Sequence, residues 1–536
     1  MVSYLSFSFF ILYFGITWLL YSLVPKKAKW CILLAGSYIF YFISAKGHII
    51  PMIASTVIIW AVGLALQKLD EVCKQKRKAA AKADKKAIRA KFNRYKYWVL
   101  TLGVVSNVAL ILIFKYTNFF IDTANSIFNL DIAHTSIIQP LGLSFFILEA
   151  ISYIADIYYG RIEAEKNPFR VSLYLSFMLT IVEGPIARYG QLGVQFKECR
   201  CATIEEVSTG FTRVLWGLFK KVVIADRCVI LVSSVFEHYE KFSGLGVIAG
   251  IAFYTLQLYC DFSGVMDVMC GLGSMFGIKM PENFARPFFA KTINEFWQRW
   301  HISLGTWLRD YIFYGISFSK GFKNLSAKAR DKFNPYYANL IPTAVALFFV
   351  WFTNGFWHGS GLKYIVYGLY YYFLMMIGLF LEPVFAKLCG KLKINRQSKP
   401  YKLFQILRTT AIVNIGMLIF KAQELNADKM SPLADLKVAA HMFKSIFTGF
   451  DLSVLSVGAK NGFGLSLYDY AAIGVGFILL VVVGLLQEKG VDIKQKIYKL
   501  PYPIKLVFLL AFVFVIIIFG AYGEGYGVVD PMYANF

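Results

Sequence analysis

Long apolar segments alternate with shorter polar ones along the whole chain. The apolar segments lie at 4–24, 30–45, 49–66, 98–114, 137–156, 170–183, 207–219, 244–260, 338–354, 362–383, 403–420, 467–486 and 504–521. A helix needs about 20 mostly apolar residues to cross a bilayer. The pattern therefore predicts an all-α polytopic membrane protein with roughly 11–13 transmembrane or re-entrant helices. Segments between 170 and 280 are expected to include tilted, short or re-entrant helices.

The composition agrees with this pattern. Apolar residues make up 57% of the chain and charged residues 16%, whereas about a quarter of a typical soluble domain is charged. The net charge is +24, but the basic residues lie between apolar segments, as in the cytoplasmic loops of membrane proteins. No nucleic-acid partner is therefore expected. The eight cysteines lack the paired C-x-x-C spacing of zinc ligands, so no metal site is predicted.

The distribution of basic residues predicts which loops face the cytoplasm. Segment 67–97 carries twelve Lys and Arg residues against three acidic ones, which is typical of a cytoplasmic loop. The basic segments 286–332, 387–402 and 489–505 are assigned to the same side. Segment 118–139 has two aspartates and no Lys or Arg, and is assigned to the outside.

The first apolar segment is expected to be a retained transmembrane helix. Residues 1–24 carry no charged side chain, and Lys26, Lys27 and Lys29 follow them. A secretory signal peptide has its positive charge before the apolar run, not after it. With this helix retained, successive crossings place both termini on the extracytoplasmic side.

Several common catalytic motifs are absent. The chain has no G-x-x-x-x-G-K-[ST] phosphate loop, no dinucleotide-binding fingerprint and no G-x-S-x-G nucleophile elbow. ATP-driven transport and serine hydrolysis within this chain therefore have little support.

The segment Thr292–Tyr314, TINEFWQRWHISLGTWLRDYIFY, has two faces at helical spacing. Its apolar face is mostly aromatic and comprises Phe296, Trp300, Leu304, Trp307 and Tyr311. Its hydrogen-bonding face comprises Asn294, Gln298, His301, Gly305 and Arg309. The periodicity predicts one amphipathic helix at the cytoplasmic interface or dipping into the protein. An ordinary interfacial helix and a helix that presents His301 to a substrate both fit this pattern.

His358 lies in the stretch WFTNGFWHGSG, between the predicted helices 338–354 and 362–383. Ionisable groups at membrane depth usually face a cavity or one another, and histidine suits general-base catalysis near neutral pH. Neighbouring glycines such as Gly359 would let a substrate approach the backbone closely. The adjacent Trp357 equally suits an interfacial aromatic anchor. The residues alone leave the catalytic base and the anchor evenly matched.

A third polar cluster lies in QLYCDFSGVMD, where Asp261 and Asp267 interrupt an apolar stretch. Carboxylates at such positions need buried partners or a cavity. A structural polar network and a cavity lining are both consistent with the pattern.

These motifs, in this order, resemble the membrane-bound O-acyltransferase family. The matching stretches are PLGLSFFILEAISYIADIYYG, EGPIARYGQL, YCDFSGVMDVMCGLGSMFGIKMPENFARPF, INEFWQRWHISLGTWLRDYIFY, NGFWHGSGLKYIVYGLYYYF and FGAYGEGYGVVDPMYANF. They look like the bacterial branch, which includes the membrane subunits of alginate O-acetylation and of D-alanylation of teichoic acids. The chain length and C-terminal extension are more similar to the alginate-type subunit.

The resemblance implies a single transmembrane domain over 1–536, with a ring of helices around a central tunnel and a catalytic core region at 257–383. It implies that His358 is the catalytic histidine and His301 the second histidine. Candidates for the tunnel or substrate lining are Asn294, Trp297, Gln298, Trp300, Arg309, Asp261, Trp357 and Gly359. The resemblance also implies an acyl-thioester donor, acetyl-CoA or an acyl carrier protein, on the cytoplasmic side and no permanently bound cofactor.

The tail 522–536 is expected to lie outside the cytoplasm, in a bacterial plasma (inner) membrane protein. Its end, MYANF, resembles a motif with a tyrosine and a terminal phenylalanine, which implies that Tyr533 relays the acyl group. Pro531 departs from the pattern of related tails, and an ordinary frayed terminus is the alternative. The resemblance further implies an extracytoplasmic SGNH-hydrolase-like acetyltransferase partner.

The expected function is transfer of an acyl group, most simply acetyl, from a cytoplasmic thioester across the membrane. The acceptors would be hydroxyls of an extracytoplasmic polysaccharide, such as an exopolysaccharide or a cell-wall polymer. An alternative is D-alanyl or other acyl transfer to teichoic acid. An alternative of another class is a polysaccharide or lipid transporter whose buried polar residues bind cargo.

Overall fold

The computed structural model describes residues 6, 8–424, 432–450, 452–456, 462–522 and 526. Within these residues the chain is helical, no strand forms, and an isolated antiparallel bridge joins Phe284 to Trp300. The prediction of an all-α polytopic membrane protein is confirmed.

The helices follow one another with short connections. Their bounds are α1 (Ile16–Leu23), α2 (Lys29–Ser44), α3 (Ile50–Ala79), α4 (Lys85–Ile111), α5 (Thr117–Phe128), α6 (Leu143–Tyr158), α7 (Pro168–Ser176), α8 (Tyr189–Glu198), α9 (Ile204–Leu218), α10 (Asp226–Glu237), α11 (Leu245–Met275), α12 (Ile293–Arg299), α13 (Ile302–Trp307), α14 (Tyr314–Ser317), α15 (Lys320–Lys332), α16 (Pro335–His358), α17 (Leu362–Lys391), α18 (Lys399–Lys421), α19 (Ala434–Ser445), α20 (Leu467–Glu488), α21 (Ile493–Tyr498) and α22 (Tyr502–Phe519). Wider π-helical turns occur at Phe9–Gly15, Leu112–Tyr116, Phe219–Ala225 and Leu308–Phe313, and 3-10 turns at Lys26–Ala28, Tyr239–Lys241, Pro287–Phe289 and Leu452–Leu455.

Eight helices of the described residues are long and apolar enough to cross a membrane. They are α3, the continuous stretch Lys85–Phe128, α11, α16, α17, α18, α20 and α22. Other predicted spans form shorter helices: segments 30–45 and 137–156 become the 16-residue helices α2 and α6, and 207–219 falls in the 15-residue α9. Segment 170–183 contains the nine-residue α7 followed by turns. Segments 170–183 and 207–219 lie in the region 170–280, where short helices were expected. Helices α2 and α6 lie earlier in the chain, outside that region.

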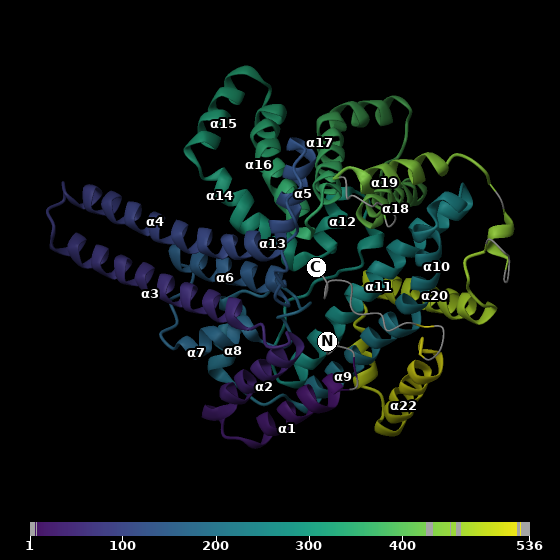
Figure 1. Cartoon of the computed structure of the whole chain (residues 1–536), viewed down its shortest axis with the longest axis horizontal. Helices are drawn as coiled ribbons and strands as arrows, with labels where there is room; N and C mark the ends of the chain where they lie inside the picture. Colours follow the sequence, from purple (N-terminus) through teal and green to yellow (C-terminus); the bar gives the residue numbers. More distant parts are fainter. Residues whose placement is uncertain are drawn as a thin grey trace.

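The centre of the molecule is built on α6 and α11, with the other helices arranged around them (Figure 1). Every residue of α6 from Leu143 to Ile157 is buried, and α11 is the most deeply buried of the eight long helices. Helix α9 packs tightly against α11 because glycines face each other across the contact. A Cβ at Gly217 would lie 2.5 Å from the carbonyl oxygen of Gly264, and one at Gly210 would lie 2.6 Å from that of Gly271. Because these glycines carry no side chain, the backbones of α9 and α11 can approach each other this closely.

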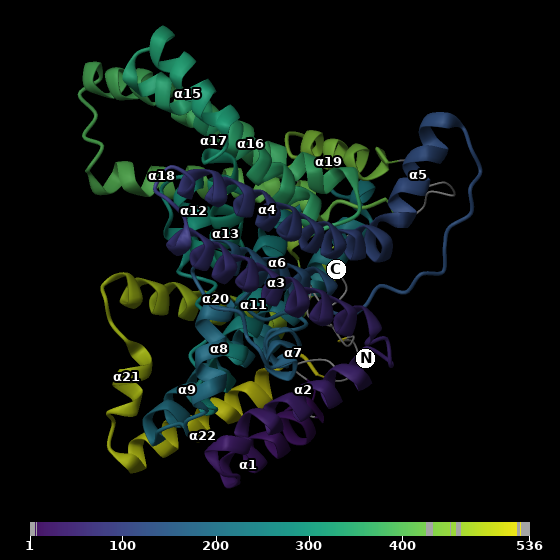
Figure 2. The same ribbon diagram turned by 90° about the vertical axis from the view of Figure 1, so that its left-hand side faces the viewer.

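Basic connections gather on one side of the bundle (Figure 2). The connection between α3 and α4, helix α15 and helix α21 lie toward the left of this view, whereas α5 and the segment that follows it lie at the right. The first group falls within the basic segments 67–97, 286–332 and 489–505, and the second within 118–139, which lacks Lys and Arg. The basic segments thus lie on one side of the molecule, and the segment without Lys or Arg lies on the other.

Candidate active site

His301 and His358 line the same cavity, although 57 positions separate them in the sequence. The cavity has a volume of about 560 Å³ and lies among α12, α13, the turn Leu308–Phe313, α16 and α17. Its polar and aromatic lining residues include Asn294, Trp297, Gln298, Trp300, His301, Thr306, Arg309, Thr343, Trp351, Asn354 and His358. Both histidines are nearly inaccessible, with 3% and 4% of their surface exposed. The cavity therefore offers two imidazoles in a space large enough for a small substrate group.

The segment 292–314 is not one amphipathic helix, and that prediction is wrong. Helix α12 ends at Arg299, Trp300 is extended with φ −112° and ψ 130°, and His301 has a left-handed backbone with φ 47° and ψ 50°. Trp300 pairs with Phe284, and the Ala285 amide donates to the Arg299 carbonyl at 2.9 Å. Extended pairing with a segment distant in the sequence thus replaces the helical hydrogen bonds here. The residues of the predicted hydrogen-bonding face line the cavity from Asn294 to Arg309, but Trp300 and Leu304 of the predicted apolar face line it too.

The buried residue Asn283 holds His301 in place. Its Oδ1 accepts hydrogen bonds from the backbone amide and the hydroxyl of Ser303, at 3.0 and 2.9 Å, and lies 3.2 Å from Nδ1 of His301. An atom that accepts from a backbone N–H is an oxygen, so Nδ1 of His301 must be the donor and its lone pair lies on Nε2. The Asn283 carbonyl also accepts from the Ile302 amide at 3.0 Å. Asn283 therefore sets both the turn and the tautomer of His301.

His358 is the last residue of α16, and two side chains from another helix hold this helix end. Lys115 donates from Nζ to the Trp357 carbonyl at 2.9 Å, and the Tyr116 hydroxyl donates to the Phe356 carbonyl. The Tyr116 ring also stacks on Phe356 with centroids 4.2 Å apart. The last carbonyls of a helix lack partners within it, and these two side chains donate to such carbonyls. The Lys115–Tyr116 pair therefore caps α16 and fixes the position of His358.

Aromatic rings surround His358. The rings of Trp357, Tyr367 and Phe420 lie at 5.0, 5.7 and 5.3 Å, each steeply inclined to the imidazole. Tyr367 lies on α17, which approaches α16 closely because a Cβ at Gly355 would lie 2.3 Å from the Tyr364 carbonyl oxygen. The imidazole is thus confined by packing on several sides.

Three predicted lining residues lie outside the lining of this cavity. Trp357 donates from its indole to the Ser144 carbonyl at 3.1 Å, and its ring lies 5.8 Å from that of His301. Gly359 accommodates Tyr364, whose ring would lie 2.2 Å from a Cβ at this position. Asp261 is paired with Lys221 at 2.8 Å, in accordance with the structural-network alternative.

Asp267 likewise belongs to an ion-pair network. Its two carboxylate oxygens accept from Lys220 Nζ at 2.7 Å and Arg213 Nε at 2.8 Å. It lines a second cavity, separate from the one that His301 and His358 line.

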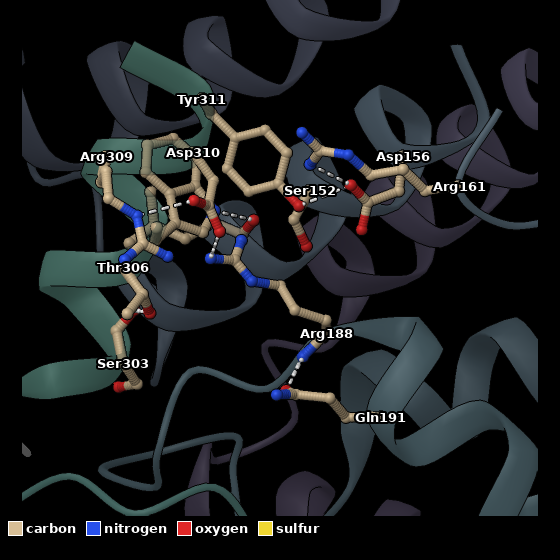
Figure 3. A network of polar contacts seen from close by, with 12 residues as sticks. Ser152, Asp156, Arg161, Arg188, Gln191, Ser303, Thr306, Arg309, Asp310 and Tyr311 are labelled. Atoms are coloured by element: carbon tan, nitrogen blue, oxygen red, sulfur yellow. Dashed lines mark hydrogen bonds and ion pairs between the residues drawn. The ribbon is translucent and has the colours of Figure 1, made fainter. Parts of the chain in front are cut away.

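Two arginines pair with Asp310, and one of them, Arg309, lines the cavity (Figure 3). Asp310 pairs with Arg309 at 3.0 Å and with Arg188 at 3.4 Å, so the two guanidinium groups lie on either side of one carboxylate. The Arg188 guanidinium also lies 4.5 Å from the centre of the Tyr311 ring. The Arg309 side chain remains 56% exposed. The end of the cavity at Arg309 therefore presents an accessible positive charge.

Sequence reasoning missed Asn283, Lys115 and Tyr116. Asn283 is a single polar residue in PENFARPF, and Lys115 a single cation in an apolar stretch. A lone buried cation was the available signal, since such residues need a partner, but no spacing connects it to α16. Tyr533 and Phe536 lie outside the described residues. Tyr526, which is described, donates to Oδ1 of Asp469 at 2.5 Å and lies against the Arg227 guanidinium at 5.3 Å.

The sequence is similar to one family model and to several named bacterial proteins. A sequence model described as the membrane-bound O-acyltransferase family matches residues 162–329, which include His301. The chain is 31% identical over 473 residues to a probable alginate O-acetylase of Pseudomonas syringae, covering 87% of this chain and 78% of the relative. It is 31% identical to a peptidoglycan O-acetyltransferase of Helicobacter pylori, over 62% of this chain and 64% of the relative. It is 29% identical to a teichoic acid D-alanyltransferase of Bacillus subtilis, over 54% and 70%.

Proposed function

Because the chain belongs to the membrane-bound O-acyltransferase family, we propose that its two-histidine cavity transfers an acetyl group from a thioester to a hydroxyl. The observation that carries the proposal is that His301 and His358 line one buried cavity. The final acceptor hydroxyls belong to an extracytoplasmic polysaccharide. Family membership favours this enzymatic role over a polysaccharide or lipid transporter.

The chemistry needs a base and an orienting group. The hydroxyl oxygen attacks the thioester carbonyl carbon, its proton passes to an imidazole, the C–S bond breaks, and the leaving sulfur takes that proton to become a thiol. A thioester is already activated, so the step consumes no ATP. His358 accepts the hydroxyl proton, and His301, whose tautomer Asn283 sets, orients the donor or the acceptor.

The donor reaches the cavity from the basic side of the molecule. Arg309 lines one end of the cavity, Arg188 pairs with the same Asp310, and the turn that carries Arg309 leads directly into α14 and the basic α15. Both proposed donors, acetyl-CoA and an acyl carrier protein, carry phosphate groups that an accessible arginine attracts. We assign this side to the cytoplasm of a bacterial plasma membrane by the positive-inside rule, with both termini on the opposite side.

The acetyl group leaves on the extracytoplasmic side. There Tyr533 relays it and an SGNH-hydrolase-like partner completes the transfer to the polysaccharide. The name of one relative, a teichoic acid D-alanyltransferase, supports D-alanyl transfer as a second candidate. The two differ in the donor thioester, so the acyl group that the purified protein accepts distinguishes them.

The test uses the full-length protein in lipid nanodiscs with isotope-labelled acetyl-CoA or acetylated carrier protein. His358→Ala should lower acetyl transfer by about 10²–10⁴-fold, the usual contribution of an acid–base group. His441→Ala is the matched control, since this histidine is exposed on α19. Transfer by His358→Ala at the rate of the control would contradict the proposal.

A further inference from the structure

A second cavity lies on the other side of Asn283 from His301. Its volume is about 660 Å³, and it lies between α9 and α11 on one side and α20, α21 and α22 on the other. The loop 282–286 forms part of its wall, so Asn283 lines this cavity while its Oδ1 contacts His301 of the first. Nothing in the proposed acyl transfer uses this space.

Charged residues line one part of the second cavity. Arg213 pairs with both Asp267 and Glu282, and the deeply buried Lys220 donates to Asp267 and to Ser263. Each carboxylate of the lining is therefore already paired with a cation of the lining.

Two further cations complete this part of the lining. Arg286 pairs with Glu488 at 2.6 Å, whereas Lys494 makes no ion pair with any residue in the described part of the chain. The lining holds four cations, Arg213, Lys220, Arg286 and Lys494, and three carboxylates pair with the first three: Asp267 and Glu282 of the lining, and Glu488 beside it. An anion placed here meets an excess of positive charge, with Lys494 as the cation that has no competing carboxylate.

The remainder of the lining is apolar and comes from two membrane-spanning helices. Leu479 and Val483 lie one turn apart on α20, and Phe508, Phe512 and Val515 lie along one side of α22. Only 6% of the most apolar stretch of α22 is buried inside the molecule, so most of this helix faces lipid.

Figure 2 shows that α20 and α22 diverge toward α21, which connects their far ends. At the other end the Tyr468 hydroxyl of α20 donates to the Ile518 carbonyl of α22 at 3.2 Å. The space between the two helices is thus held closed at one end and widens toward the basic α21.

We propose that this cavity binds an anionic phospholipid, with its phosphate at Lys494 and an acyl chain between α20 and α22. Basic pockets between transmembrane helices recognise anionic lipid headgroups on the side of the membrane where basic residues gather. A soluble phosphate compound would leave the apolar walls without a partner, whereas an acyl chain covers them. The lipid also packs against Phe284 and Ala285, the residues that pair with the segment carrying His301.

The headgroup contact is tested by native mass spectrometry of the delipidated full-length protein with phosphatidylglycerol, in competition with phosphatidylcholine. Lys494→Glu should reduce phosphatidylglycerol retention by at least about fivefold. The matched control is Lys496→Glu, an exposed residue on the same helix that does not line the cavity. Equal retention by the two variants, or retention of both lipids to the same extent, would overturn the assignment of the headgroup.

The acyl-chain contact is tested at the opposite part of the cavity. Ala511→Trp should fill the space and reduce lipid retention, while Leu510→Trp, at a neighbouring position of the same helix that does not line the cavity, should not. Displacement of the lipid by millimolar glycerol 3-phosphate, with no effect of Ala511→Trp, would show a site for soluble phosphate and overturn the proposal. Because the two substitutions lie in different helices and no step measures acyl transfer, failure of this proposal is distinguishable from failure of the proposed activity.

Discussion

The Oδ1 atom of Asn283 lies 3.2 Å from Nδ1 of His301, and it also accepts two hydrogen bonds from Ser303. One buried side-chain oxygen therefore holds Ser303, near the start of α13, and sets the tautomer of the His301 imidazole, which lines the cavity. The carboxamide is a positioning group: it acts on the reaction through His301.

Asn283→Ala should lower kcat for acyl transfer by about 10–100-fold, as loss of a group that orients a ligand or base does elsewhere. Asn283→Asp keeps the acceptor and should retain more activity. Its carboxylate would favour the charged imidazolium of His301, so the acid limb of the pH–rate profile should move to higher pH. The measurement is kcat against pH for both variants, with thermal unfolding as a check on folding. An unshifted profile in Asn283→Asp would show that Asn283 serves folding alone.

Tyr116→Phe should lower both the stability of the protein and its activity, because it removes the donor to the Phe356 carbonyl at the end of α16. The stacked ring remains, so the expected loss is that of one hydrogen bond to a buried carbonyl, about 1–3 kcal/mol. The measurement is thermal unfolding in detergent together with the rate of acyl transfer.

The matched control for this substitution is Tyr372→Phe on α17. Its hydroxyl makes no hydrogen bond within the described residues. If both variants unfold at the same temperature and transfer acyl groups equally, the capping role of Tyr116 is wrong.

Gly217→Ala should destabilise the contact between α9 and α11, because the new methyl group would lie 2.5 Å from the Gly264 carbonyl oxygen. Overpacking of this kind costs about 1–3 kcal/mol. Gly474→Ala on α20, where nothing lies within 4 Å of the added carbon, is the control and should leave unfolding unchanged or delayed. Equal unfolding midpoints for the two variants would mean that α9 and α11 can move apart to admit the methyl group with little loss of stability.

The orientation of the protein is testable with single cysteines in a cysteine-free background. A membrane-impermeant maleimide should label Ala81→Cys, in the connection between α3 and α4, only after the inner face is exposed. Ser136→Cys, in the segment between α5 and α6, should react in intact cells. The reverse labelling pattern would show that the protein has the opposite orientation and that the donor side of the cavity faces outward.

Hydropathy alone predicted the all-α membrane fold, because each long apolar segment must satisfy its backbone as a helix in lipid. Periodicity also predicted that Asn294, Gln298, His301 and Arg309 share a face, and all four line the cavity. The continuous helix through Trp300 and His301 was wrong, because that prediction weighed only local spacing. The backbone pairing with 283–285 that breaks the helix depends on residues brought together by folding.

The sequence by itself determined the features that depend on local composition: the helices, the basic side of the molecule and the two histidine motifs. Only the tertiary structure decided that His301 and His358 line one cavity, that Asn283 sets the tautomer of His301, and that Lys115 and Tyr116 cap α16. These relationships join residues from separate helices and loops. No periodicity along the chain encodes such distances, since they follow from how the helices pack.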